Sequence, residues 1–208
     1  MADVAYIRAV PVTAAQLDRT TLEAARDGHA WAQHAVLKHF ERPVWAIVCR
    51  VLGRAGRDGQ ADDVAQDALL GVLRGLPRYD VDHPAAMSTW VLTIATRTAL
   101  SALRRSARER VRFDDELVAA TDERAPHCVG EDRPDRVAER REAASAIADA
   151  VEHLSPEIRA AFVLRAYHDL EYEEIARILE IELGTVKSRL WRARAALQQR
   201  LSEVRRDR

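Results

Sequence analysis

The apolar positions of the chain recur every three or four residues, the spacing at which side chains share one face of a helix. This pattern covers residues 22–52, 61–76 and 87–108, and a final stretch that starts near residues 137–143. Asp27-Gly28 is predicted to interrupt the first run, and Pro43 offers a second break there. Segments with the alternating pattern of a strand-rich sheet are not found. The pattern predicts an all-α protein.

One long stretch between these helices lacks a sustained apolar face. Residues 113–134 are charged and contain Pro126, Gly130 and Pro134, a composition typical of flexible linkers. We therefore predict two small helical domains joined by a flexible linker, the second domain containing a helix-turn-helix. The predicted divisions are an N-terminal tail (1–20), a first domain (21–108), the linker (109–138) and a second domain (139–208).

The second domain has the sequence form of a helix-turn-helix. A short helix over residues 172–179 is followed by a turn at 180–183, Gly184, and a basic helix for which Thr185 is the predicted N-cap. At about 100° per residue, one narrow stripe of that last helix is apolar and should be core: Val186, Leu190, Ala193, Leu197 and Leu201. The remaining surface carries Thr185, Lys187, Ser188, Arg189, Trp191 and Arg192. Such a face suits a DNA major groove, although a solvated polar face on an ordinary packed helix is the alternative.

Charge is segregated along the chain although the total is nearly balanced. The 208 residues carry 32 basic and 33 acidic side chains, a net charge of −1. Residues 143–182 carry 3 basic and 9 acidic side chains, whereas residues 183–208 carry 8 basic and 2 acidic, a net +6. A partner that touches only the basic stretches meets a positive surface. The balance therefore does not exclude nucleic acid, and the acidic segments could shield the basic helices in the free protein.

The 87–108 helix carries a second basic face. Leu92, Ala95, Ala99 and Leu103 form its expected buried stripe, while Trp90 projects to the far side. In line with that indole stand Ile94, Arg97, Ser101, Arg104 and Arg105. A cationic track beside an aromatic platform is how single-stranded nucleic acid is bound. Alternatively, Trp90 packs beneath the preceding loop and the arginines are simply exposed.

The 61–76 helix has a surface of a different kind. Asp63, Gln66, Asp67 and Leu70 lie together on one side. An acidic surface with a leucine suits a protein partner better than DNA, and a solvated acidic face is the alternative.

Motifs in both domains resemble those of bacterial RNA polymerase sigma factors. Residues 62–68 (DDVAQDA), 88–95 (STWVLTIA) and 103–105 (LRR) resemble the second conserved region of that family. Residues 174–176 (EIA), 184–190 (GTVKSRL) and 192–194 (RAR) resemble the fourth region. With two regions and a short linker, the chain resembles the extracytoplasmic-function (group IV) sigma factors from about Leu22 to Leu201.

The resemblance implies partners and a role for each surface. Core RNA polymerase would bind Asp63, Gln66, Asp67 and Leu70 through its clamp helices. The melted −10 promoter strand would be read and held by Tyr79, Met87, Trp90, Arg97, Arg104 and Arg105. The −35 element would be read as duplex by Thr185, Lys187, Ser188, Arg189, Trp191 and Arg192. The polymerase does the chemistry, so no catalytic group, cofactor or metal is implied, and an anti-sigma factor is a further candidate partner.

Three positions near the expected melted strand depart from the family pattern. Met87 stands where an aromatic residue is common, Arg97 where asparagine is common, and Ser101 where aspartate is common. The −10 preference therefore does not follow from the resemblance.

Other protein classes fit less well. The main rival is a LuxR-like helix-turn-helix regulator that acts without being a polymerase subunit. A metal-dependent hydrolase is disfavoured because His29, His34 and His39 are spaced by five, which rotates them off a common face. No run of about 18 apolar residues or signal-peptide pattern occurs, so we expect neither membrane insertion nor secretion. Two cysteines, Cys49 (expected in the core) and Cys128, suit a reducing cytoplasm.

Overall fold

The computed structural model describes residues 17–53, 59–82, 86–113 and 147–206. The first part contains α1 (Arg19–Arg26), α2 (Ala30–Leu52), α3 (Gln60–Gly75), the 3-10 turn η3 (Leu76–Arg78) and α4 (Met87–Phe113). A helical segment over residues 147–152 precedes α6 (Pro156–His168), α7 (Tyr172–Leu179) and α8 (Leu183–Arg206). The described residues contain helices and turns and no strand, which confirms the predicted all-α class.

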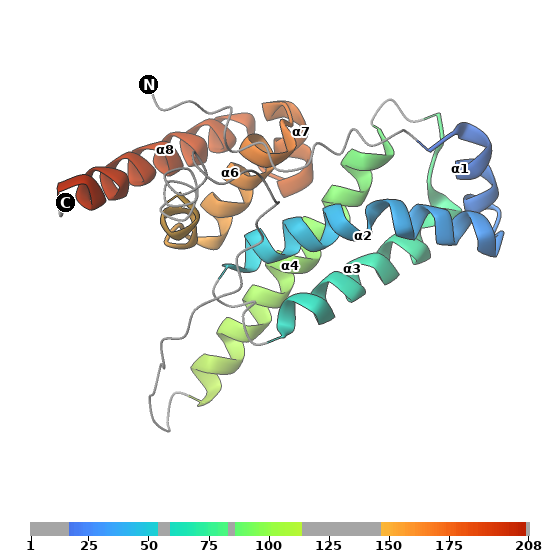
Figure 1. The fold of residues 1–208 in the computed structure, drawn as a ribbon, viewed down its shortest axis with the longest axis horizontal. Helices are drawn as coiled ribbons and strands as arrows, with labels where there is room; N and C mark the ends of the chain where they lie inside the picture. The colour runs from blue at the N-terminus through green and yellow to red at the C-terminus, as the bar shows by residue number, and fades with distance from the viewer. Residues whose placement is uncertain (1–16, 54–58, 83–85, 114–146, 207–208) are drawn as a thin grey trace, which may run out of the picture.

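The first region is a bundle of α2, α3 and α4, with α1 packed against α2 (Figure 1). The predicted break at Asp27-Gly28 is confirmed, because α1 ends at Arg26 and Gly28 has a φ of +93°. Pro43, by contrast, does not break α2. Val36, Phe40, Val44 and Ile47 are buried on both sides of the proline, so packing outweighs the lost backbone hydrogen bond.

The second region is the predicted helix-turn-helix, formed by α7 and α8 on α6. The four described members of the predicted apolar stripe of α8 are buried: Val186, Leu190, Ala193 and Leu197. Helix α7 begins with a capping box that was not predicted from the sequence. The Glu171 side chain accepts a hydrogen bond from the backbone N–H of Glu174, and the Glu174 side chain accepts one from the backbone N–H of Glu171. Thr185 as N-cap of the last helix is wrong, because α8 begins two residues earlier and Thr185 N already donates to Glu182 O at 2.9 Å.

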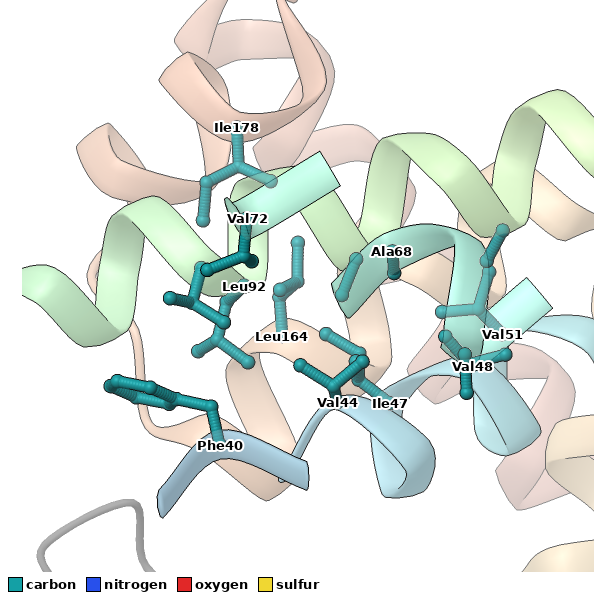
Figure 2. Packing of buried hydrophobic residues seen from close by; sticks show 14 of the residues in the cluster. Phe40, Val44, Ile47, Val48, Val51, Ala68, Val72, Leu92, Leu164 and Ile178 are labelled. Carbon is teal, nitrogen blue, oxygen red and sulfur yellow. The ribbon is translucent and has the colours of Figure 1, made fainter. Parts of the chain in front are cut away.

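The two regions are packed against each other and share one apolar core. Helices α6, α7 and α8 gather on one side of the α2–α4 bundle (Figure 1), and α6 contacts α2 while α7 contacts α4. Figure 2 shows Leu164 of α6 among Val44, Ile47 and Leu92 of the first region. A smaller cluster around Phe162, Ala193 and Leu197 belongs to the second region alone. The sequence predicted the two regions but not their contact.

A buried arginine lies at this contact. Arg159 of α6 is 5% exposed and donates from Nη1 to Glu152 O at 3.2 Å. Its guanidinium lies against Gly53, the residue that ends α2 with a φ of +55°. A Cβ at Gly53 would collide with Nη1 of Arg159. The backbone conformation therefore favours glycine at this position, and the guanidinium of the second region approaches it closely.

Two predicted segments fall largely outside the described residues. Of the predicted linker (109–138), only residues 109–113 are described, and they continue α4 beyond its predicted end at about Arg108. Of the predicted tail (1–20), only residues 17–20 are described, and Arg19 already begins α1. Among the described residues, no helix combines the length and apolar character needed to cross a membrane.

Candidate nucleic-acid and polymerase interfaces

The outer face of α8 gathers all six side chains predicted to read duplex DNA. Lys187, Trp191 and Arg192 are exposed, and the indole of Trp191 is 70% accessible. Thr185, Ser188 and Arg189 are half-buried beside them, and Ser188 Oγ donates to Thr185 O at 2.9 Å. The opposite face is the apolar stripe, so packing fixes the orientation of the helix and leaves these side chains outward. Within the described residues, no carboxylate forms an ion pair with Lys187 or Arg192.

Trp90 of α4 is half-buried against the turn that precedes its helix. Its ring lies 5.0 Å from the ring of Tyr79, at a tilt of 46°. Its other neighbour is Gly75, where an added Cβ would lie 2.6 Å from Cζ2 of Trp90. This is the packing that the sequence analysis left open as the alternative to an exposed platform. Gly75 is a residue of this site that the sequence analysis missed, and only the position of the indole reveals it.

The six residues predicted for the −10 strand divide into two groups. Tyr79 and Met87 are each 8% exposed and belong to the core, and burial raises the pKa of the Tyr79 phenol. Arg97, Arg104 and Arg105 are exposed on α4. The structure therefore supplies a cationic face supported by buried aromatic packing, with Trp90 at the boundary between the two groups.

Arg97 is engaged by the second region, 80 residues further along the chain. Its Nε donates to Ile178 O at 3.0 Å and its Nη2 donates to Arg177 O at 3.1 Å. Its Nη1 lies 3.1 Å from Glu180 Oε1. Thr89, which lies nearer the N-terminus of α4, donates from Oγ1 to Glu174 Oε1 at 3.3 Å. The sequence predicts Arg97 on the DNA face and contains no signal for these contacts.

The acidic surface of α3 is exposed as predicted. Asp63, Gln66, Asp67 and Leu70 are all exposed, and Leu70 is 40% accessible. Trp45 of α2 adjoins this surface, because its Nε1 donates to Asp62 Oδ1 at 2.8 Å while 39% of the residue stays accessible. An exposed indole beside an exposed leucine enlarges the apolar part of the surface. Trp45 was not predicted for this surface, because it belongs to a different helix and reaches α3 only through the packing of the two helices.

Metal-binding clusters of three or more His, Cys, Asp or Glu side chains do not occur among the described residues. Cys49 is half-buried and packs against the core, close to its predicted place. Cys128 lies outside the described residues.

Two family models match the chain over separate segments. Residues 36–109 match "Sigma-70 region 2" and residues 144–197 match "Sigma-70, region 4". These segments contain the α3–α4 surfaces and the helix-turn-helix respectively, and together they span more than half of the 208 residues. The chain belongs to the sigma-70 family of RNA polymerase sigma factors.

Similar proteins cover nearly the whole chain. The RNA polymerase sigma-H factor of Pseudomonas aeruginosa is 28% identical over 193 residues, which cover 91% of this chain and 96% of that protein. The ECF RNA polymerase sigma-E factor of Escherichia coli is 27% identical over 188 residues, which cover 90% and 95%.

Two solved structures share the fold. The sigma factor RpoE in complex with the anti-sigma factor NepR from Bartonella quintana has a TM-score of 0.62 at 22% identity, covering 81% of this chain and 96% of that one. CnrH in complex with the cytosolic domain of CnrY has a TM-score of 0.55 at 23% identity, covering 89% and 97%.

Proposed function

We propose that this alternative sigma factor divides promoter recognition among three surfaces: α8 reads the −35 duplex, α4 holds the melted −10 strand and α3 binds core polymerase. The observation that carries the proposal is the outward basic face of α8, fixed by its buried stripe, together with the matches to regions 2 and 4. The protein acts as an initiation factor and leaves catalysis to the polymerase. Its proposed place of action is the cytoplasm.

The α8 surface has the chemistry of major-groove readout. Arg192 can donate two parallel hydrogen bonds to a guanine edge, and Lys187 can hold a phosphate. The indole of Trp191, 70% exposed, offers an apolar surface to a thymine methyl or a deoxyribose. These contacts are available to a duplex without any change in the packing of α8.

The α4 surface has the chemistry of single-strand binding. Arg104 and Arg105 offer exposed guanidinium groups to the phosphates, and Trp90 offers the open part of its indole to a base. Tyr79 and Met87 are buried, so their proposed role is to hold Trp90 and the start of α4 in place.

The α3 surface has the chemistry of a protein contact. Exposed Asp63, Gln66 and Asp67 surround Leu70, with Trp45 adjoining. An exposed leucine and indole can be buried by a partner, while the carboxylates select a basic surface on it. We assign this surface to the clamp helices of core polymerase. An anti-sigma factor, of the kind bound in the RpoE structure, is a proposed competitor for the chain.

Transcription in vitro with core polymerase on a promoter library tests the proposal. We expect holoenzyme formation and initiation from a subset of promoters with a common −35 and −10 sequence. Specific duplex binding by the free chain, with no association with core polymerase, would instead favour a LuxR-like regulator.

Replacing Arg192 by alanine is expected to weaken recognition of the −35 element. If Arg192 makes a bidentate base contact, the loss is about 1–3 kcal/mol and discrimination at one base pair relaxes. Competition binding of holoenzyme to promoters mutated at each −35 position measures both effects. Arg200→Ala is the matched control, because Arg200 is an exposed arginine of the same helix that contacts His153 Nε2 at 2.8 Å. If the two variants lose equal promoter affinity and the base preference does not change, Arg192 contributes only through its charge and does not read a base.

A further inference from the structure

The end of α7 presents a strong site for a cation. The last carbonyls of a helix have no partner within the helix and carry the negative end of its dipole. Here Glu180 terminates α7 in the left-handed conformation, with a φ of +54°, and adds a carboxylate beside those carbonyls. The site thus combines two carbonyl oxygens and one carboxylate within reach of a single guanidinium.

Arg97 occupies this site with three of its nitrogen atoms. Nε and Nη2 donate to the carbonyls of Ile178 and Arg177, and Nη1 pairs with Glu180. A guanidinium presents its donors in a fixed planar fork, so three acceptors arranged around it hold it in one orientation. Thr89 adds a fourth polar contact through Glu174, on the same side of α4.

We infer that Arg97 is an autoinhibitory latch, which in the free chain holds the first helix of the helix-turn-helix over the −10 face of α4. The inference rests on the −10 role proposed for that face. The Arg97 nitrogens that would donate to a phosphate already bind α7, so a melted strand and α7 compete for the same guanidinium. The shared apolar core brings the two regions together, and Arg97 is the part of the contact for which an anionic strand can compete.

The latch acts on one DNA surface and not on the other. Lys187, Trp191 and Arg192 stay exposed while Arg97 is engaged. The closed chain therefore offers its −35 face, whereas the Arg97 part of its −10 face is engaged by α7. Release of α7 would couple single-strand capture to a rearrangement of the two regions.

The first experiment follows the distance between the regions in the free chain. Fluorophores are placed through unnatural amino acids at Lys38 on α2 and Gln198 on α8, both exposed. In single-molecule energy transfer, we expect one closed population in the unmodified chain and a second, longer-distance population in Arg97→Ala. Arg104→Ala is the matched control, because Arg104 is an exposed arginine of α4 that contacts only Ser101 Oγ at 3.1 Å among the described residues. An unchanged distribution in Arg97→Ala, or the same change in both variants, would overturn the latch.

The second experiment frees Arg97 without removing it. Glu180→Lys places a positive charge against the guanidinium, whereas Glu173→Lys makes the same charge change on α7 where the described residues show no side-chain contact with α4. Binding of a fluorescent single-stranded oligonucleotide is measured by anisotropy. We expect about 3–10-fold tighter binding for Glu180→Lys than for Glu173→Lys, which corresponds to about 0.7–1.4 kcal/mol.

The two experiments separate the latch from the function on which it rests. If Arg97→Ala opens the chain but no variant binds the oligonucleotide, the latch stands and the −10 assignment fails. If Glu180→Lys and Glu173→Lys bind the oligonucleotide equally and neither alters the distance distribution, the latch is wrong while the −10 assignment remains. If Glu180→Lys both opens the chain and binds more tightly, the latch and its competition with the strand are supported together.

Discussion

Replacing Leu164 by alanine is expected to lower the free energy of unfolding by about 2–5 kcal/mol, the range for a leucine removed from a packed core. Leu164 is 0% exposed and lies in the core that both regions share. The cavity would therefore weaken both regions at once. Urea denaturation followed by circular dichroism measures the loss, and we expect region 2 and region 4 to lose stability together. A variant in which only region 4 melts earlier would show that the regions fold independently.

Leu70→Ala is the matched control for that prediction. Leu70 is 40% exposed on α3, so the same truncation leaves almost no cavity and should change the free energy of unfolding by less than about 1 kcal/mol. Its expected effect is on polymerase affinity, measured by competition for core enzyme. The two leucines thus separate stability from binding, and equal stability losses would contradict the difference in burial.

Stability is expected to fall by about 3 kcal/mol as the pH is lowered from 6.5 to 4 because of one histidine. Both ring nitrogens of His168 are buried without a hydrogen-bond partner among the described residues. Burial, and then the positive charge of Arg50, lower the pKa of His168 from 6.5 to about 4. Below pH 6.5, His168 binds a proton in the unfolded chain but stays neutral in the folded chain until the pH nears 4. Each pH unit in this window therefore costs about 1.4 kcal/mol of stability.

His168→Leu isolates this contribution from those of the carboxylates. Leucine has a similar size and no titrating group, and it leaves no nitrogen unpaired, so the variant should lose less stability on acidification. Urea denaturation between pH 4 and 7 measures the difference in slope between the variant and the unmodified chain. Parallel pH profiles would show that His168 is already protonated in the folded protein or equally shielded when unfolded.

The residues of the two recognition surfaces illustrate what could be predicted locally. The apolar stripe of α8 is set by spacing within one helix, so its burial and the outward direction of Lys187 and Arg192 followed from the sequence. The exposure of Asp63 and Leu70 on α3 followed in the same way. Trp90 was ambiguous, because periodicity gives the direction of a side chain but not what lies above it. Its packing on Gly75 and Tyr79 depends on the path of the preceding turn.

The sequence by itself determined the helices, the two regions, the family and the face of each helix that carries charge. These are properties of neighbours within one turn or of motifs, and a few residues of context suffice to define them. Only the tertiary structure decided that the two regions share a core and that the Arg97 side chain binds the C-terminal end of α7. That contact joins residues 80 and 81 positions apart. Its acceptors are backbone carbonyls, which every residue possesses and which leave no mark in a sequence. Side-chain patterns therefore revealed the surfaces, while the partner of Arg97 depended on the folded chain.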